Sequence, residues 1–185
     1  MRKNRQNMNL DTLIVDMQSK DKKFKNIFKR FQVVFFLFVI LYGGLFLVNP
    51  DSELTLNHRI AGVFYVLGFS AFTFYLRKYY KIYNKVNYSD PVKKVLEDAE
   101  KRYRKFKPDS LIVFTGVLFI NAATLLMTIG NIFESRGTLY SFLLVEMLFL
   151  GSLGFGLVIG ILWWRRDSKP IWLSVKNLLK ELEEE

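Results

Sequence analysis

The sequence contains no cysteine and a single histidine, His58. Disulfide bonds, thiol catalysis and cysteine-ligated metal sites are therefore excluded, and one histidine cannot form a zinc site by itself. The sequence also lacks a phosphate-binding P-loop, a dinucleotide-binding glycine motif, a zinc-protease motif and a nucleophile elbow. We therefore expect that the protein is not an enzyme, and we expect no cofactor and no bound metal.

Four long apolar runs of the sequence contain almost no charged residues. These runs are Phe31–Val48, Ile60–Leu76, Ser110–Phe133 and Leu139–Trp164, and Glu146 is the one charged residue within them. A helix rises about 1.5 Å per residue and a bilayer core is about 30 Å thick, so roughly 20 residues cross it. The runs predict four membrane-spanning helices, with the lipid bilayer as their surroundings.

Positive charge is scarce in two connections between these runs. Asn49–Arg59 and Glu134–Thr138 contain only Arg59 and Arg136, whereas the other 25 of the 27 Lys and Arg residues lie on the opposite side of the predicted spans. Connections rich in Lys and Arg remain in the cytoplasm. We therefore expect a multi-pass protein of the cell (inner) membrane with both termini cytoplasmic. This bias and contact with anionic lipid explain the net charge of +10 without nucleic acid as a partner.

The first run is predicted to be a permanent span rather than a cleaved signal, because it follows about 30 polar residues and no small-residue cleavage site ends it. The expected fold class is all-α: a polytopic membrane protein with four transmembrane helices in two hairpins, plus amphipathic cytoplasmic helices. The predicted order is a cytoplasmic helix at 1–30, a hairpin at 31–76, a helical linker at 77–109, a second hairpin at 110–164 and a tail helix at 165–185.

Apolar residues recur at helical spacing in all three cytoplasmic segments. In the first segment Leu10, Met17 and Phe24 are seven residues apart, which predicts a helix that continues into the first span. In the linker, Ser89-Asp90 is expected to cap a helix that has Pro91 in its first turn and ends before Lys107-Pro108. A tail helix is predicted to start at Ser168-Lys169-Pro170.

These helices present apolar faces that must lie on the membrane, on each other or on a protein partner. Phe106 extends the linker face, and Asp98–Arg102 is expected to form an ion pair on the opposite, polar face. We predict that the following residues bind a partner: Val92, Val95, Leu96, Tyr103, Leu178 and Leu182.

Glu146 and a set of polar residues form a candidate polar site inside the predicted membrane region. A charge at the centre of a span costs about 2.5–3.5 kcal/mol on insertion scales, so such a residue faces protein or water rather than lipid. Asn121, Thr124, Thr128 and Asn131 form a polar stripe on one side of the third span. Thr128 or Asn131 is expected to hydrogen-bond Glu146. The stripe either joins two helices or lines a polar cavity.

Small residues predict where the spans approach one another closely. Ser152, Gly156 and Gly160 form a ridge on one side of the fourth span, and Gly68 and Ala71 share a side of the second. Glu146 lies at the edge of the ridge. A homo-oligomer that forms through this ridge is one open alternative.

Two functions follow from these patterns. The first is a membrane-embedded adaptor or regulatory subunit that binds a protein partner through its cytoplasmic amphipathic helices. The alternative is a small oligomeric channel or transporter subunit with a polar path at Glu146 and the stripe from Asn121 to Asn131.

Overall fold

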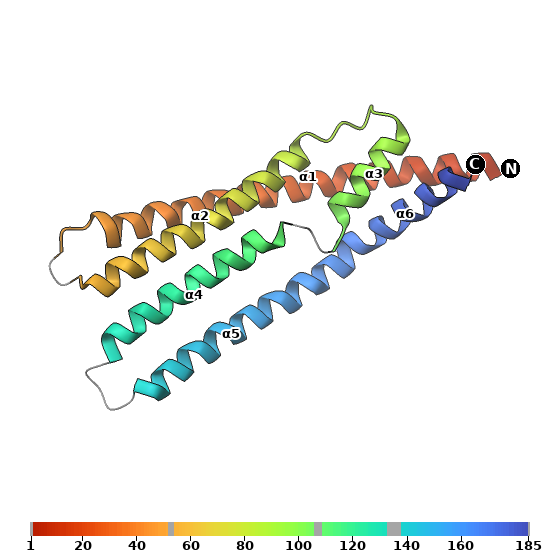
Figure 1. The fold of residues 1–185 in the computed structure, drawn as a ribbon. Coiled ribbons are helices and arrows are strands. Elements are labelled where there is room, and N and C mark those ends of the chain that lie inside the picture. The colour runs from red at the N-terminus through yellow and green to blue at the C-terminus, as the bar shows by residue number, and fades with distance from the viewer. Residues whose placement is uncertain (1, 52–53, 106–108, 133–137, 185) are drawn as a thin grey trace. The chain divides into compact units, whose positions relative to one another are not determined.

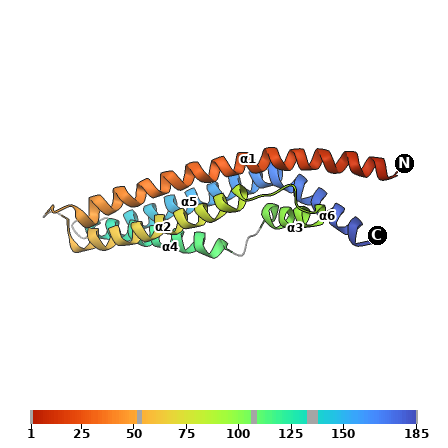
Figure 2. The same cartoon turned by 90° about the horizontal axis from the view of Figure 1, so that it is seen from above.

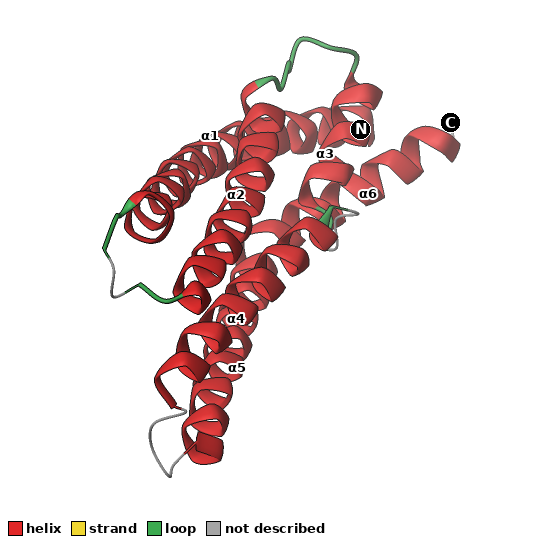
Figure 3. Ribbon diagram, turned by 60° about the vertical axis from the view of Figure 1, so that its left-hand side comes forward, coloured by secondary structure: helices red, strands yellow, loops and turns green. Residues whose placement is uncertain are grey.

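The computed structural model describes residues 2–51, 54–105, 109–132 and 138–184. All regular elements within these ranges are helices (Figures 1 and 3). Four helical stretches are long and apolar enough to cross a membrane: Leu10–Val48, Leu56–Asn84, Ser110–Thr128 and Phe142–Glu184. These findings confirm the all-helical class and the four apolar helices that the sequence predicts.

Helix α1 (Arg2–Tyr42) joins a polar segment to the first apolar run without interruption, as predicted. It passes into a π-helical turn, Gly43–Val48, in which the Asn49 amide donates to the Gly44 carbonyl at 3.0 Å. Gly43 and Gly44 have low helix propensity, so the regular helix is weakest where the wider turn begins.

Helix α5 (Thr138–Trp163) continues through a second π-helical turn, Trp164–Ser168, into α6 (Lys169–Glu184). The predicted tail helix is present as α6, which begins at Lys169, and it follows α5 through the π-helical turn without a break in the helical backbone. Proline has no N–H group, and in a regular helix its ring clashes with the carbonyl four residues earlier. The π-helical turn widens the helix just before Pro170, which accommodates the ring without a break.

The chain divides into two compact units. Unit 1 contains Met1–Ile27, Tyr79–Pro108 and Val158–Glu185, and unit 2 contains Phe28–Lys78 and Asp109–Leu157. Unit 1 thus combines three polar segments that lie far apart in the sequence, whereas unit 2 contains most of the apolar helical length.

Unit 1 is built around one apolar core, to which α1, α3 (Val92–Tyr103) and α6 contribute. Figures 1 and 2 show α3 beside α6. Residues on each helix are three or four positions apart, so they share one face. The buried core residues are Leu13, Met17, Val95, Leu96, Ala99, Tyr103, Ile171 and Val175. The predicted apolar faces therefore lie on each other, which is one of the three arrangements that the sequence allows.

Helix α3 begins differently from the prediction. Pro91 occupies the N-cap position and no side chain caps the first turn, whereas the Asp90 carboxylate pairs with Lys94 at 2.8 Å. Phe106 and the Lys107-Pro108 break lie outside the described residues.

In unit 2, α2 (Leu56–Asn84) contacts both α1 and α4 (Ser110–Ile132). The rings of Phe35 and Phe72 stack between α1 and α2 with centroids 5.0 Å apart. Toward α4, a Cβ atom at Gly68 would lie 2.7 Å from Ile120 Cγ1 and 3.0 Å from the Gly116 carbonyl oxygen. The absence of a side chain at Gly68 thus lets two helix backbones approach, as the small-residue pattern predicts.

Candidate functional site

Two acidic side chains are buried among the described residues of unit 1. Asp21 retains 4% of its accessible surface and Asp167 retains 6%. A buried carboxylate is tolerated when hydrogen bonds and an opposite charge replace its hydration. Each of the two has these partners, and most of them come from a different segment of the chain.

Asp21 on α1 accepts hydrogen bonds from two tyrosines. Tyr103 Oη donates to Asp21 Oδ1 at 2.5 Å, and Tyr88 Oη donates to Asp21 Oδ2 at 2.6 Å. Burial, together with the negative charge of Asp21, raises the pKa of both phenols well above the usual value for tyrosine. Both hydroxyls therefore remain protonated donors at neutral pH, and they connect α1 to α3 and to the segment before α3.

Arg102 on α3 supplies the opposite charge, with its Nη2 atom 3.2 Å from Asp21 Oδ2. The prediction that Arg102 pairs with Asp98 is therefore wrong. Arg102 lies on the same face of α3 as Val95 and Ala99, so its side chain points into unit 1 and pairs with Asp21. Its Nε atom is buried without a hydrogen-bond acceptor, and its buried Nη2 atom contacts Asp21 as an ion pair without forming a hydrogen bond. The seven-residue spacing from Val95 is the sequence signal that could have revealed this orientation.

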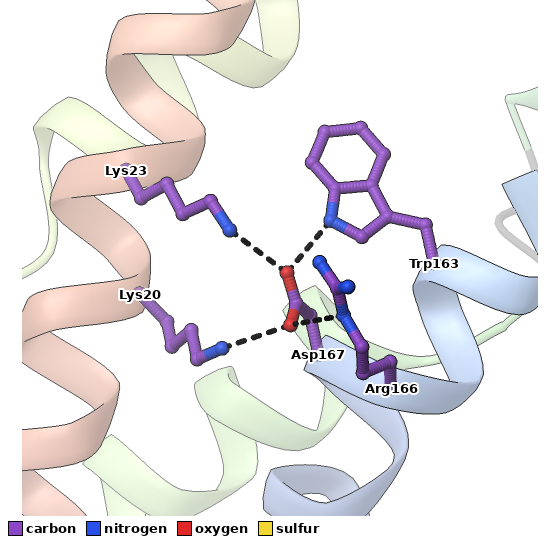
Figure 4. A network of polar contacts seen from close by, with 5 residues as sticks. All are labelled: Lys20, Lys23, Trp163, Arg166 and Asp167. Atoms are coloured by element: carbon purple, nitrogen blue, oxygen red, sulfur yellow. Dashed lines mark hydrogen bonds and ion pairs between the residues drawn. The ribbon is translucent and has the colours of Figure 1, made fainter.

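Asp167 lies in the π-helical turn between α5 and α6, and Figure 4 shows its partners. Lys23 Nζ donates to Oδ2 at 2.9 Å, Lys20 Nζ donates to Oδ1 at 3.1 Å, and Trp163 Nε1 donates to Oδ2 at 2.6 Å. Arg166 Nε lies 3.5 Å from Oδ1. The hydrogen bond from Lys23, with those from Lys20 and Trp163, holds the pKa of Asp167 far below its usual value. The carboxylate thus remains charged and fastens the start of α6 to α1.

A cleft of about 490 Å³ opens beside α3 within unit 1. Residues from the end of α2, from the connection that follows it and from α3 line the cleft. Its charged lining residues are Lys85, Asp90, Lys94, Asp98, Lys101 and Arg102. The cleft cannot be found from sequence spacing, because its lining combines residues before and after a turn of the chain.

Glu146 is half-buried on α5, and its hydrogen-bond donor is not one that the sequence predicts. Asn121 Nδ2 on α4 donates to Glu146 Oε2 at 3.4 Å, which is a long hydrogen bond. Thr128 Oγ1 instead donates to the Thr124 carbonyl oxygen of its own helix at 2.8 Å. The Asn131 side chain lies outside the described part of the chain. The structure therefore brings Asn121 and Glu146 together.

Thr124 contacts α2 rather than Glu146. Its hydroxyl lies 3.0 Å from Tyr65 Oη, and it also donates to the Ile120 carbonyl oxygen at 2.9 Å. The polar stripe on α4 thus provides one contact to α5 through Asn121 and one to α2 through Thr124.

The predicted ridge on α5 is exposed along its length. A Cβ atom at Gly156 or Gly160 would meet no atom within 4 Å, and Ser152 is exposed while its hydroxyl donates to the Phe149 carbonyl oxygen. Close packing of this ridge against another helix stays a prediction that a second copy or another protein would have to fulfil.

The residues predicted to bind a partner fall into two groups. Val95, Leu96 and Tyr103 are buried in the core of unit 1. Val92 and Leu182 are exposed, at 41% and 42%, and Leu178 packs at the edge of the core. A partner that meets the folded unit can therefore contact only the second group directly.

Comparisons with protein-family models, with curated proteins and with solved structures find no match to this chain. The described residues also contain no group of three or more His, Cys, Asp or Glu side chains that could hold a metal ion. The fold thus defines an all-helical protein whose four apolar helices are compatible with a multi-pass membrane protein.

Proposed function

We propose that this chain is an integral protein of the inner membrane that acts as an adaptor or regulatory subunit. In this proposal the four apolar helices span the bilayer, and unit 1 lies in the cytoplasm and binds a protein partner. The distribution of Lys and Arg supports the orientation, because the segments that form unit 1 contain most of them.

The observation that carries the proposal is the separate core of unit 1. Its helices bury their apolar faces on one another, with Met17, Leu96 and Val175 fully inaccessible. Two buried carboxylates, Asp21 and Asp167, add bonds between its segments. A unit organised in this way presents a fixed surface, and a fixed surface allows recognition without the cost of ordering the helices on binding.

Orientation is tested first, with reporter domains fused in the loop at Asn49–Arg59 and at the C-terminus. The proposal requires the loop reporter to be extracytoplasmic and the C-terminal reporter to be cytoplasmic. The opposite result would place unit 1 outside the cytoplasm and exclude a cytoplasmic partner.

Partner binding is tested with a photo-crosslinking amino acid at Val92 or Leu182, the exposed members of the predicted face. The matched control is position 97, because Glu97 is exposed on α3 outside that face. We expect one defined protein to be crosslinked from 92 and 182, and Val92→Glu to abolish crosslinking from 182. Equal yields from 97, or crosslinks to lipid alone, would refute the proposal.

A channel or transporter subunit is the second candidate, and the contact between Asn121 and Glu146 favours it. An ionisable side chain within a span is costly, and one long hydrogen bond is weak compensation. Under this function, liposomes containing the protein conduct ions or protons, and Glu146→Gln abolishes the flux. Tight vesicles with the unaltered protein would eliminate this candidate.

A further inference from the structure

The cleft beside α3 contains cations whose charge the protein does not neutralise. Lys94 pairs with Asp90, and Asn87 Nδ2 also donates to Asp90 at 2.7 Å, so this pair is satisfied internally. Lys85 and Lys101 line the same cleft, and no carboxylate in the described part of the chain forms an ion pair with either. Two exposed ammonium groups are thus available to an anion.

Arg102 contributes a third cation, which is buried in the lining. Its side chain is 7% exposed, and its charge is balanced by Asp21. Its Nε atom nevertheless has no hydrogen-bond acceptor, and its Nη2 atom contacts Asp21 as an ion pair without forming a hydrogen bond. Buried polar groups are nearly always hydrogen-bonded, so this lack is unusual. The planar guanidinium group carries five N–H donors in a fork that matches the oxygens of a phosphate.

Asp98 is the opposing charge in the cleft, and no cation of the described residues pairs with it. It repels an anion, so the cleft is not a uniformly positive surface. The lining as a whole still contains four cations and two carboxylates. Its volume of about 490 Å³ falls in the range of roughly 300–1,000 Å³ that is typical of small-molecule sites.

We propose that the cleft formed by the end of α2 and by α3 binds a phosphate group, which Lys85, Lys101 and Arg102 hold. The phosphate belongs either to the headgroup of an anionic lipid or to a soluble phosphate compound, since both present the same oxygens. The site lies within unit 1, so it depends neither on the proposed protein partner nor on the orientation in the membrane.

Isothermal titration calorimetry of the full chain in an uncharged detergent tests this proposal with two probes. Inorganic phosphate represents the soluble source. Short-chain phosphatidic acid represents the lipid source, with short-chain phosphatidylcholine as its control. Saturable binding of inorganic phosphate assigns the site to soluble phosphates, and binding of phosphatidic acid alone assigns it to a lipid headgroup. Binding of neither probe overturns the proposal.

Three variants then locate the site. Lys85→Gln with Lys101→Gln removes both exposed cations, and we expect the affinity to fall about tenfold or more. Asp98→Asn removes the repelling carboxylate, and we expect the affinity to rise about threefold. Lys93→Gln is the matched control, because Lys93 is exposed on α3 and does not line the cleft.

These variants change exposed residues, so unit 1 is expected to fold in each, and the tryptophan emission spectrum verifies this. The opposite signs expected for the lysine and aspartate changes separate a binding site from a general loss of structure. Equal weakening by Lys93→Gln, or weaker binding in Asp98→Asn, would show that phosphate does not bind in the cleft and would overturn the proposal.

Discussion

Replacing Asp21 by asparagine is expected to destabilise unit 1 strongly. The substitution keeps the shape of the side chain but removes the charge that balances Arg102, and it replaces one acceptor oxygen by an NH₂ group. Removing one partner of a buried ion pair costs about 3–5 kcal/mol. A buried hydroxyl left without an acceptor, here Tyr88 or Tyr103, costs roughly 1–3 kcal/mol. Because these terms overlap, we expect the free energy of unfolding to fall by about 3–5 kcal/mol in total.

The tryptophans provide an assay that is specific to unit 1. The chain has three, Trp163, Trp164 and Trp172, and all of them lie in this unit. Trp164 Nε1 donates to the Tyr103 carbonyl oxygen at 3.0 Å, so its surroundings change when α3 separates from the π-helical turn Trp164–Ser168. Tryptophan emission during urea unfolding in a nonionic detergent therefore follows unit 1 without a contribution from unit 2. The midpoint should decrease with little change in slope.

A double variant distinguishes loss of the ion pair from general disruption of the core. Arg102→Met removes the unpaired charge that Asp21→Asn leaves behind, so the double variant should be more stable than Asp21→Asn alone. A loss of less than about 1 kcal/mol in Asp21→Asn would refute the role assigned to this carboxylate. A double variant no more stable than the single one would refute the role assigned to the pair.

Three further predictions concern packing and pH. Leu96→Ala, at a fully buried position, should lower the stability of unit 1 by about 2–5 kcal/mol, whereas Leu182→Ala should change it by less than about 1 kcal/mol in the same urea assay. Gly68→Ala should increase hydrogen exchange in α4, because its Cβ would meet Ile120 and Gly116, whereas Gly156→Ala should leave exchange in the monomer unchanged. The folded state lowers the pKa of Asp167, so its stabilisation is complete above the unfolded value of about 3.9 and is lost as the pH falls below it. Urea midpoints measured from pH 6 to pH 3 should therefore fall more steeply for the unaltered protein than for Asp167→Asn, and parallel curves would contradict this account.

The helices and their apolar faces could be predicted because they depend on local spacing. Leu10, Met17 and Phe24 recur every seven residues, and α1 follows that spacing into the first apolar run. The faces that contain Leu96 and Leu178 were also predicted correctly as helical faces. Their packing on each other was left open, since periodicity identifies an apolar face but not what covers it.

The buried carboxylates could not be predicted, because their partners are distant in the sequence. The bond between Tyr88 and Asp21 joins residues 67 positions apart, and the bond between Lys20 and Asp167 joins residues 147 positions apart. Spacing arguments detect only neighbours on one helix, which is why Arg102 was assigned to Asp98. The expectation that oppositely charged residues four positions apart form an ion pair fails when the arginine lies on the buried face of its helix.

The position of Glu146 was predicted only in part. The sequence predicts that Thr128 or Asn131 donates to Glu146, but its hydrogen bond comes from Asn121. Both threonine hydroxyls donate to carbonyl oxygens of their own helix four residues earlier, which is the usual local alternative for threonine. Composition does not specify the offset of one helix along another.

Unit 1 is assembled from three segments that are separated in the sequence, and this has a consequence for biosynthesis. Helix α6 is synthesised after the segments that contain α1 and α3, and it contributes Ile171 and Val175 to their common core. Until α6 leaves the ribosome, the apolar faces around Met17 and Leu96 have no complete covering and are open to chaperones and proteases. Completion of unit 1 therefore requires that all four apolar helices have already been made. A protein interrupted before α6 would present exposed apolar surface, which marks it for removal.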